Sequence, residues 1–359
     1  MEQAIAPPLA QLFVVEAATV LAGPSVGLFF AELGARVVKA EPPQGDVTRA
    51  WKLPIEDASG PVSAYFSSVN WGKEHARLNL KDADERARFD ALLREADVLI
   101  TNHLAADAEK LGLERDRLRA LNPRLVHGHI KGFADQPWRP AYDAVLQAEM
   151  GYISMTGTDE EQVAKLPIAL IDVLAAHQLK EGLLLALMAR ERTGKGAFVE
   201  VSLEEAALAG LINQASNHLM TGAVARPMGT LHPNIAPYGE VLRCADGGRI
   251  LLAVGSDAQF RALCDVLGAS PLASDPRFPT NALRVAHRAA LAEALAPAFA
   301  SSGRDTLLEK LLRADVPCGA VRRIDEVLAS AVARGALLES RIDGVITRRL
   351  RGNAFRITE

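Results

Sequence analysis

Cysteine is scarce in this chain of 359 residues, which carries only Cys244, Cys264 and Cys318, with no CxxC pair. We therefore expect neither a disulfide framework nor a thiolate metal site. His127 and His129 alternate on an expected strand and share a face. No acidic or cysteine partner stands at ligand spacing from them, so the sequence predicts no metal site.

A strong charge of one sign and a long apolar run are also missing. Forty basic and 44 acidic side chains give a net charge of −4, which does not favour binding to nucleic acid or to an anionic membrane. Apolar stretches such as 166–176 are interrupted by charged residues, whereas a membrane span needs about 20 nearly uninterrupted apolar residues. The first residues show no basic segment followed by a long apolar core. We therefore expect a cytoplasmic protein without a membrane partner.

The dinucleotide fingerprint GxGxxG is absent from the first βα unit, where only Gly23 and Gly27 are glycines, so nicotinamide binding has little support. The unit itself is clear. Residues 12–18 form an apolar run typical of a buried strand, Pro24 suits the first turn of a helix, and Gly34 suits its end. With a second strand at 36–40, this βαβ start places its turns where α/β sheets bind ligands.

Strands and helices continue to alternate, which predicts an α/β fold with a parallel sheet covered by helices. The alternation of strands and helices ends at an expected loop at 226–239, which an expected hairpin at 241–254 follows, so we expect a domain boundary there. We predict a larger domain made of 1–225 and 326–359 and a smaller α+β domain at 226–325. The alternating tail 341–358 is expected to form a strand that returns to the larger domain. Further expected strands lie at 76–80, 98–100, 124–130 and 198–202, and further helices at 82–95, 118–121, 172–192, 203–221, 257–267, 286–299 and 305–313.

Asp172 is the outstanding candidate for chemistry, because it lies in the aliphatic stretch LPIALIDVL. A carboxylate among apolar neighbours is costly to bury unless it is paired, caps a helix or stays protonated. One hypothesis makes Asp172 the N-cap of the following helix. The other makes it a carboxylate nucleophile at a helix start, where free N–H groups could stabilise an oxyanion. The two hypotheses are compatible.

Other polar residues give weaker signals. Arg49, Lys73 and Lys131 could each contact phosphate, but each alone is more simply a solvated cation. The Tyr142-Asp143 pair after a proline turn is more often structural than catalytic. The segment 193–196 contains Gly-Lys-Gly but lacks the rest of a P-loop, so we expect a turn there.

Taken together and in order, several segments resemble the class III CoA-transferases, the CaiB/BaiF family. The resemblance extends over nearly the whole chain. Its segments are VLAGPSVGLFFAELGARVVKAEPPQGDVTR from Val20, DVLITN from Asp97, KLGL from Lys110, LNPR from Leu121, AYDAVLQAEMG from Ala141, SMTGT from Ser154, RTGKG from Arg192 and VPCGAV from Val316.

The resemblance implies a Rossmann-like large domain built from both chain ends and an interlocked dimer of two ring-shaped chains. It implies that Asp172 is the catalytic aspartate, which attacks an acyl-CoA thioester to form an anhydride and then an aspartyl-CoA thioester. Coenzyme A is then a substrate rather than a tightly bound cofactor, and a small carboxylic acid is the other substrate.

The resemblance also implies binding residues. Contacts to CoA are expected from Leu21, Leu80, Asn102, Lys110 and Arg139. Contacts to the acyl group or acid are expected from Tyr142, Asp143, His232 and Tyr238.

Two alternatives remain open. Racemases of this family carry a histidine base where this chain has Tyr142, and tyrosine, with a pKa near 10, is a poor base at neutral pH. This favours a transferase over a 2-methylacyl-CoA racemase or epimerase. The other alternative is a non-catalytic CoA-binding homologue.

Overall fold

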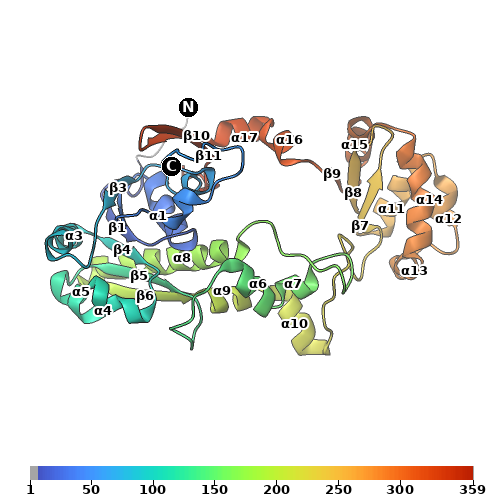
Figure 1. Cartoon of the computed structure of the whole chain (residues 1–359). Coiled ribbons are helices and arrows are strands. Elements are labelled where there is room, and N and C mark those ends of the chain that lie inside the picture. The colour runs from blue at the N-terminus through green and yellow to red at the C-terminus, as the bar shows by residue number, and fades with distance from the viewer. Residues whose placement is uncertain (1–6, 359) are drawn as a thin grey trace. The chain divides into compact units, whose positions relative to one another are not determined.

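The computed structural model describes residues 7–358. The chain divides into two compact units (Figure 1). The larger contains the chain up to residue 152, residues 165–224 and the chain from 331 onward; the smaller contains 153–164 and 225–330. The domain limits expected from the sequence remain a prediction.

A six-stranded parallel sheet forms the centre of the larger unit, in the order β3-β2-β1-β4-β5-β6. The order reverses at β1, so β1 and β4 flank the switch point where ligands bind in open α/β sheets. The α/β class predicted from the sequence is confirmed. The strands are β1 (Phe13–Ala17), β2 (Arg36–Glu41), β3 (Glu74–Arg77), β4 (Val98–Thr101), β5 (Val126–Lys131) and β6 (Ala197–Ser202).

Helices cover both faces of this sheet. On one face α1 (Ala22–Glu32) and α8 (Leu170–Thr193) pack together and against the central strands (Figure 1). Gly128 permits this approach, because a Cβ there would lie 3.0 Å from the Leu183 side chain. On the other face α3 (Ala83–Glu95) and α5 (Arg115–Leu121) bury a second apolar cluster around Phe89 and Leu93. Burial on both faces explains why all four residues of β4 are inaccessible.

Shorter elements complete the larger unit. The predicted tail strand is instead a hairpin, because Asp343 and Gly344 both adopt positive φ and turn the chain after Ile342. The elements are α2 (Ala64–Ser67), α4 (Ala108–Leu111), α6 (Asp143–Glu149), α9 (Leu203–Gly210), α10 (Ile212–Thr221), α17 (Ala331–Ala336), β10 (Leu337–Ile342), β11 (Val345–Leu350) and the 3-10 turns Val47–Ala50 and Ala105–Asp107, with α7 (Tyr152–Met155) continuing into the residues of the smaller unit.

The smaller unit has an antiparallel sheet in the order β7-β8-β9 and its own apolar core around Phe260, Leu291 and Phe299. The predicted hairpin is its β7–β8 pair. Its elements are β7 (Tyr238–Arg243), β8 (Arg249–Ala253), β9 (Cys318–Ala320), α11 (Asp257–Val266), α12 (Ser270–Ser274), α13 (Asn281–Ala286), α14 (Arg288–Ala300), α15 (Arg304–Arg313) and α16 (Ile324–Leu328).

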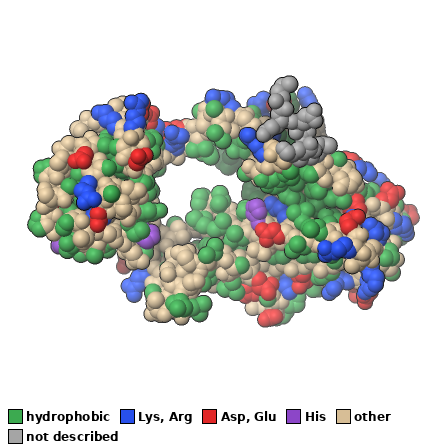
Figure 2. Space-filling model, turned by 180° about the vertical axis from the view of Figure 1, so that it is seen from behind, with side chains coloured by type: hydrophobic (Ala, Val, Ile, Leu, Met, Phe, Trp, Pro, Cys, Tyr) green, Lys and Arg blue, Asp and Glu red, His purple; other side chains and the backbone are tan. Residues whose placement is uncertain are grey.

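Charges of both signs are interspersed on the face drawn in Figure 2, with hydrophobic side chains between them. Among the described residues, no helix has the length and apolar character to cross a bilayer.

Candidate active site

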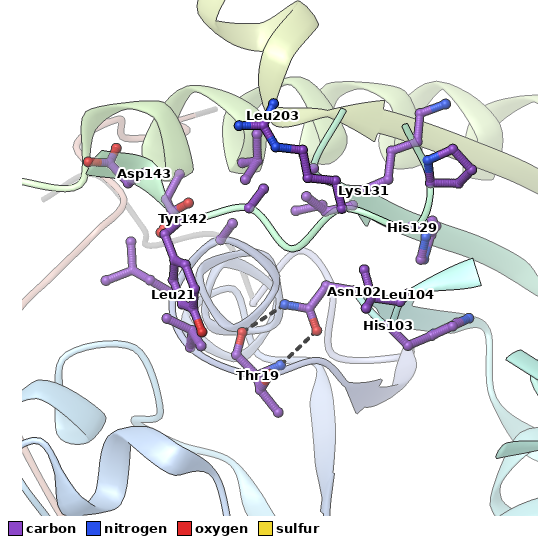
Figure 3. Close-up of a pocket in the computed structure, with 18 of the residues that line it drawn as sticks. Thr19, Leu21, Asn102, His103, Leu104, His129, Lys131, Tyr142, Asp143 and Leu203 are labelled. Atoms are coloured by element: carbon purple, nitrogen blue, oxygen red, sulfur yellow. Dashed lines mark hydrogen bonds between the residues drawn. The ribbon is translucent and has the colours of Figure 1, made fainter. Parts of the chain in front are cut away.

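A cavity of about 220 Å³ opens in the larger unit where β1, β4 and β5 end (Figure 3). Asp172 contributes to its wall. The walls come from the β1–α1 turn, the segments after β4 and β5, and the starts of α6, α8 and α9: Thr19, Val20, Leu21, Ala22, Asn102, His103, Leu104, Ala105, His129, Ile130, Lys131, Gly132, Pro137, Arg139, Ala141, Tyr142, Asp143, Asp172, Glu200 and Leu203.

The β1–α1 turn is held firmly in place. Val20 adopts a φ of 70°, a conformation that a β-branched residue takes only when its surroundings impose it. The Asn102 side chain accepts from the Thr19 N–H at 3.0 Å and donates to the Thr19 carbonyl at 2.8 Å (Figure 3). Asp46 accepts from the Val20 N–H at 3.3 Å. Asn102 therefore shapes the cavity wall.

Buried cations hold the flanks of the same turn. Lys39 donates to the Ala18 carbonyl at 2.7 Å and Lys73 to the Pro24 carbonyl at 2.9 Å. Both ammonium groups pair with the inaccessible Glu16 carboxylate, at 2.9 and 2.7 Å. The interpretation of Lys73 as a solvated cation is therefore wrong, because its charge is buried and paired.

The other two candidate phosphate contacts are also paired. Arg49 is buried and makes a bidentate pair with Glu41, at 2.6 and 2.7 Å, so it is not a solvated cation either. Lys131 lines the cavity, and its ammonium pairs with the Glu200 carboxylate at 2.8 Å. That contact raises the pKa of the Lys131 ammonium.

Asp172 lies in the first turn of α8 and is only 8% exposed. The hypothesis that it is the N-cap is wrong, since α8 begins at Leu170 and Ala169 is its N-cap residue. Within the described chain, no hydrogen bond or ion pair engages the Asp172 carboxylate. Burial raises its pKa to about 7, and the nearby Asp143 carboxylate adds to the rise. A desolvated, unpaired carboxylate of this kind is a strong nucleophile once ionised.

Asp143, rather than Asp172, caps the start of α8. Its Oδ1 accepts from the Ile171 N–H at 2.7 Å, and its Oδ2 accepts from the Gln147 amide at 2.5 Å. The Gln147 side chain also accepts from the Leu166 N–H at 2.8 Å and donates to the Ile168 carbonyl at 3.3 Å. These bonds connect α6 to the chain that leads into Asp172, so they position that side chain.

A second cavity of about 480 Å³ meets the first at shared residues, since Thr19, Asn102 and His103 line both. It lies beyond the ends of β2 and β3, and its walls include the apolar side chains of Leu78, Leu80 and Leu111. Two adjoining cavities of this kind can hold an elongated molecule, with one end beside Asp172 and the other between apolar side chains.

The structure distributes the expected CoA contacts over these cavities. Leu21 lines the first, Leu80 the second and Asn102 both. Arg139 lines the first, but its guanidinium pairs with Glu149, with Nη1 3.0 Å from Oε2, and stacks on Phe133 at 4.0 Å. Lys110 lines neither; its exposed ammonium pairs with Asp107 at 3.1 Å. The roles of these residues remain predictions.

Of the four expected substrate contacts, Tyr142 and Asp143 line the cavity beside Asp172. Tyr142 is 57% exposed. His232 and Tyr238 belong to the smaller unit, where their rings are in edge contact with centroids 5.1 Å apart.

Sequence reasoning missed Thr19 and His103. Thr19 and His103 line both cavities, and each follows the carboxyl end of a strand flanking the switch point, which is the signal that could have identified them. Tyr65 lines neither cavity, but burial raises the pKa of its phenol and the charges of Asp172 and Asp143 raise it further.

This chain resembles known proteins in sequence and in fold. A curated relative in Agrobacterium fabrum, succinate–glutarate CoA-transferase, is 37% identical over 330 residues, which are 90% of this chain and 82% of the relative. An acetyl-CoA:oxalate CoA-transferase of Acetobacter aceti is 36% identical over 93% of this chain and 86% of its own.

The fold agrees with these similarities. The crystal structure of a CaiB/BaiF family protein from Brucella suis superposes with a TM-score of 0.88 at 36% identity, covering 98% of this chain and 92% of that one. The sequence model described as CoA-transferase family III matches residues 9–351. The chain therefore belongs to CoA-transferase family III, as its ordered sequence segments indicated.

Proposed function

We propose that this protein transfers coenzyme A from an acyl-CoA to a carboxylic acid, with Asp172 as the nucleophile. The observation that carries the proposal is the Asp172 carboxylate itself, which is buried, unpaired among the described residues and open to a cavity that continues into a second one. An acyl-CoA is an elongated molecule with a reactive thioester at one end, and this pair of cavities suits it.

The chemistry proceeds through two anhydrides. The Asp172 carboxylate attacks the thioester carbonyl, the C–S bond breaks, and CoA leaves as a thiolate. The thiolate attacks the Asp172 carbonyl of the anhydride, which releases the donor acid and leaves an aspartyl-CoA thioester. The acceptor carboxylate then attacks that thioester and expels the thiolate, which finally attacks the acceptor carbonyl. Asp172 is thereby regenerated as a carboxylate, and no water is consumed.

The site supports each requirement of this sequence. The nucleophile is held at the first turn of α8, where the helix dipole stabilises the negative charge that burial disfavours. Tyr142 stands where the racemases carry a histidine, which leaves the site without that base. We propose that the acid carries two carboxylates, because the two relatives are named for succinate, glutarate and oxalate. We also propose a cytoplasmic homodimer.

Trapping the intermediate tests the mechanism. Incubation with succinyl-CoA and no acceptor should leave one CoA-sized adduct on the chain, seen by intact-mass spectrometry. Hydroxylamine should convert it to a hydroxamate at Asp172, since thioesters yield to that nucleophile and free carboxylates do not. Addition of glutarate or oxalate should remove the adduct.

The Asp172→Ala variant should form no adduct and lose transfer by a factor of at least about 10³. An active wild-type preparation that repeatedly gives neither adduct nor hydroxamate would exclude the covalent route. Rapid exchange of the α-proton of 2-methylacyl-CoA in deuterated water would favour the racemase instead.

A further inference from the structure

A third cavity lies away from the proposed CoA site. It has a volume of about 690 Å³ and is found beside α5 and the starts of β5 and β6, whereas the Asp172 cavity lies where β5 ends. Its size falls in the range of small-molecule sites. The proposed transferase mechanism makes no use of it.

Positive charge predominates in its wall. Arg115, Arg119 and Lys195 line it, against the one carboxylate of Asp116. Many arginines of this chain form ion pairs, but within the described residues no carboxylate lies within ion-pair distance of these three cations. The wall therefore carries a net charge of about +2 that the protein itself leaves uncompensated.

A buried histidine lines the same cavity. His127 is 6% exposed, and its Nδ1 has no hydrogen-bond partner among the described residues. The Phe198 ring packs edge-on against it at 5.0 Å, and the Arg115 guanidinium stacks on Phe198 at 4.0 Å. A buried ring nitrogen without a partner is unfavourable, so a ligand that reaches Nδ1 would supply the missing hydrogen bond.

Phosphate fits both features. Its charge suits three unpaired cations, and a monohydrogen phosphate group can accept a hydrogen bond through its oxygens or donate one through its O–H. Its oxygens can accept from the Nδ1–H tautomer of His127, and its second negative charge suits the cationic wall better than the single charge of a carboxylate. Burial lowers the pKa of His127 to about 3, with neighbouring positive charges adding to the effect, so the ring is neutral.

The other ring nitrogen of His127, Nε2, is connected to the Asp172 cavity by two hydrogen bonds. Thr101 Oγ1 lies 2.8 Å from His127 Nε2 and 2.8 Å from His129 Nδ1, and His129 lines the Asp172 cavity. A threonine hydroxyl donates a single hydrogen bond, so it can donate to one ring and accept from the other, but not donate to both. When the hydroxyl donates to His127 Nε2, it must accept from the Nδ1–H of His129, so this tautomer of His127 fixes that of His129.

We propose that the cavity beside α5 binds a small phosphate-bearing molecule, and that the Thr101 hydroxyl links this site to the Asp172 cavity through His127 and His129. A phosphate oxygen that accepts from His127 Nδ1–H leaves Nε2 to accept from the Thr101 hydroxyl, and His129 is then held in its Nδ1–H tautomer. The proposal concerns a site distinct from that of the proposed transfer reaction.

Phosphate titration of the full-length protein tests the binding site. Binding of inorganic phosphate is measured by isothermal titration calorimetry, with sodium chloride added to keep the ionic strength constant. We expect the titration to saturate at one phosphate per chain. The double variant Arg119→Gln/Lys195→Gln should bind at least about ten-fold more weakly. The control Arg88→Gln, which removes an exposed cation of α3 outside these cavities, should bind as wild type.

Two further arms identify the ligand. Titration with glycerol 3-phosphate shows which form of phosphate the site takes. Tighter binding than that of inorganic phosphate identifies a phosphomonoester as the ligand. Equal or weaker binding identifies the free ion. Repetition with saturating CoA should still show one phosphate site per chain, because the two cavities are distinct. Absence of saturation, equal affinity in the double variant and wild type, or displacement by CoA would each overturn the site.

Nuclear magnetic resonance of ¹⁵N-histidine tests the link. Phosphate should shift the ring nitrogens of both His127 and His129 in wild type and in Thr101→Ser, which keeps the hydroxyl. In Thr101→Val it should shift those of His127 alone. A His129 shift that persists in Thr101→Val, or that is missing in wild type, would refute the link.

Discussion

At the scale of single residues, the site depends on a carboxylate kept in unfavourable surroundings. Asp172 is buried and has no hydrogen bond within residues 7–358, while Asp143 beside it has two hydrogen bonds. The bonded carboxylate organises the backbone, and the unbonded one remains reactive. Such a division is the usual cost of an active site, because a reactive group is retained at the expense of stability.

Replacement of Asp172 by Asn should stabilise the protein while abolishing transfer. The pKa of Asp172 in the fold, about 7, exceeds the usual value of 3.8, so the folded state holds more protons between these pH values. The contribution of this group to stability therefore falls as pH rises from about 4 to 7. The amide carries no charge, so the variant should gain up to about 4 kcal/mol over wild type at pH 8.

Urea unfolding at a series of pH values measures this difference. The gap between Asp172→Asn and wild type should widen from pH 4 to pH 7 and stay constant above. A gap that is constant with pH, or that favours wild type at pH 8, would show that Asp172 is not a destabilising buried charge.

Asp143→Asn tests how the two carboxylates interact. Asparagine can still accept from the Ile171 N–H, but it removes a negative charge that raises the pKa of Asp172. The rising limb of kcat/KM against pH, which reports the ionisation of the free enzyme, should therefore move toward lower pH. The control Glu109→Gln removes an exposed charge of α4 and should leave the limb in place. A shift toward higher pH would contradict this assignment.

At the scale of elements, the position of Asp172 depends on how α6 holds the start of α8. Gln147 is inaccessible and bonds to Leu166, Ile168 and Asp143. Gln147→Leu keeps the bulk and removes all three bonds, so kcat should fall about 10- to 100-fold, the cost of misplacing a catalytic group. The KM for CoA esters should change little.

Hydrogen exchange separates this effect from general instability. In Gln147→Leu the amides of Leu166 and Ile171 should exchange faster, while those of the central strands keep their protection. Gln178→Leu, an exposed change on α8, should alter neither exchange nor kcat. Normal kcat in Gln147→Leu would show that these bonds do not position Asp172.

The elements were predictable where a local pattern specified them. The fully buried β4, the capped α3 and the glycine after α8 all follow from apolar runs, capping residues and left-handed glycines. The helix cap at α8 was not predictable, since the carboxylate that provides it comes from Asp143, 28 residues before Ile171. The buried Glu16–Lys39–Lys73 group was hidden for the same reason, because its members come from separate segments.

At the scale of the whole molecule, the larger unit leaves apolar side chains uncovered. On α10, Ile212, Leu219 and Met220 are 73%, 82% and 83% exposed, and Leu208 on α9 is 53% exposed. Contiguous exposed apolar side chains mark interaction sites on soluble proteins. They support the homodimer that the family resemblance implies.

We therefore expect the protein to elute with twice the mass of one chain in size-exclusion chromatography with light scattering. If the two chains are interlocked, separation requires one of them to unfold, so the dimer should persist on dilution to nanomolar concentration.

Leu219→Glu/Met220→Glu places two charges on the exposed apolar face of α10. Burying unpaired charge at an interface is unfavourable, so this variant should assemble poorly. Gln214→Glu/Asn217→Glu adds the same charge to polar positions on the other side of the same helix and should remain dimeric. A wild-type protein with the mass of one chain at micromolar concentration would exclude the dimer, and full assembly of Leu219→Glu/Met220→Glu would exclude α10 from its interface.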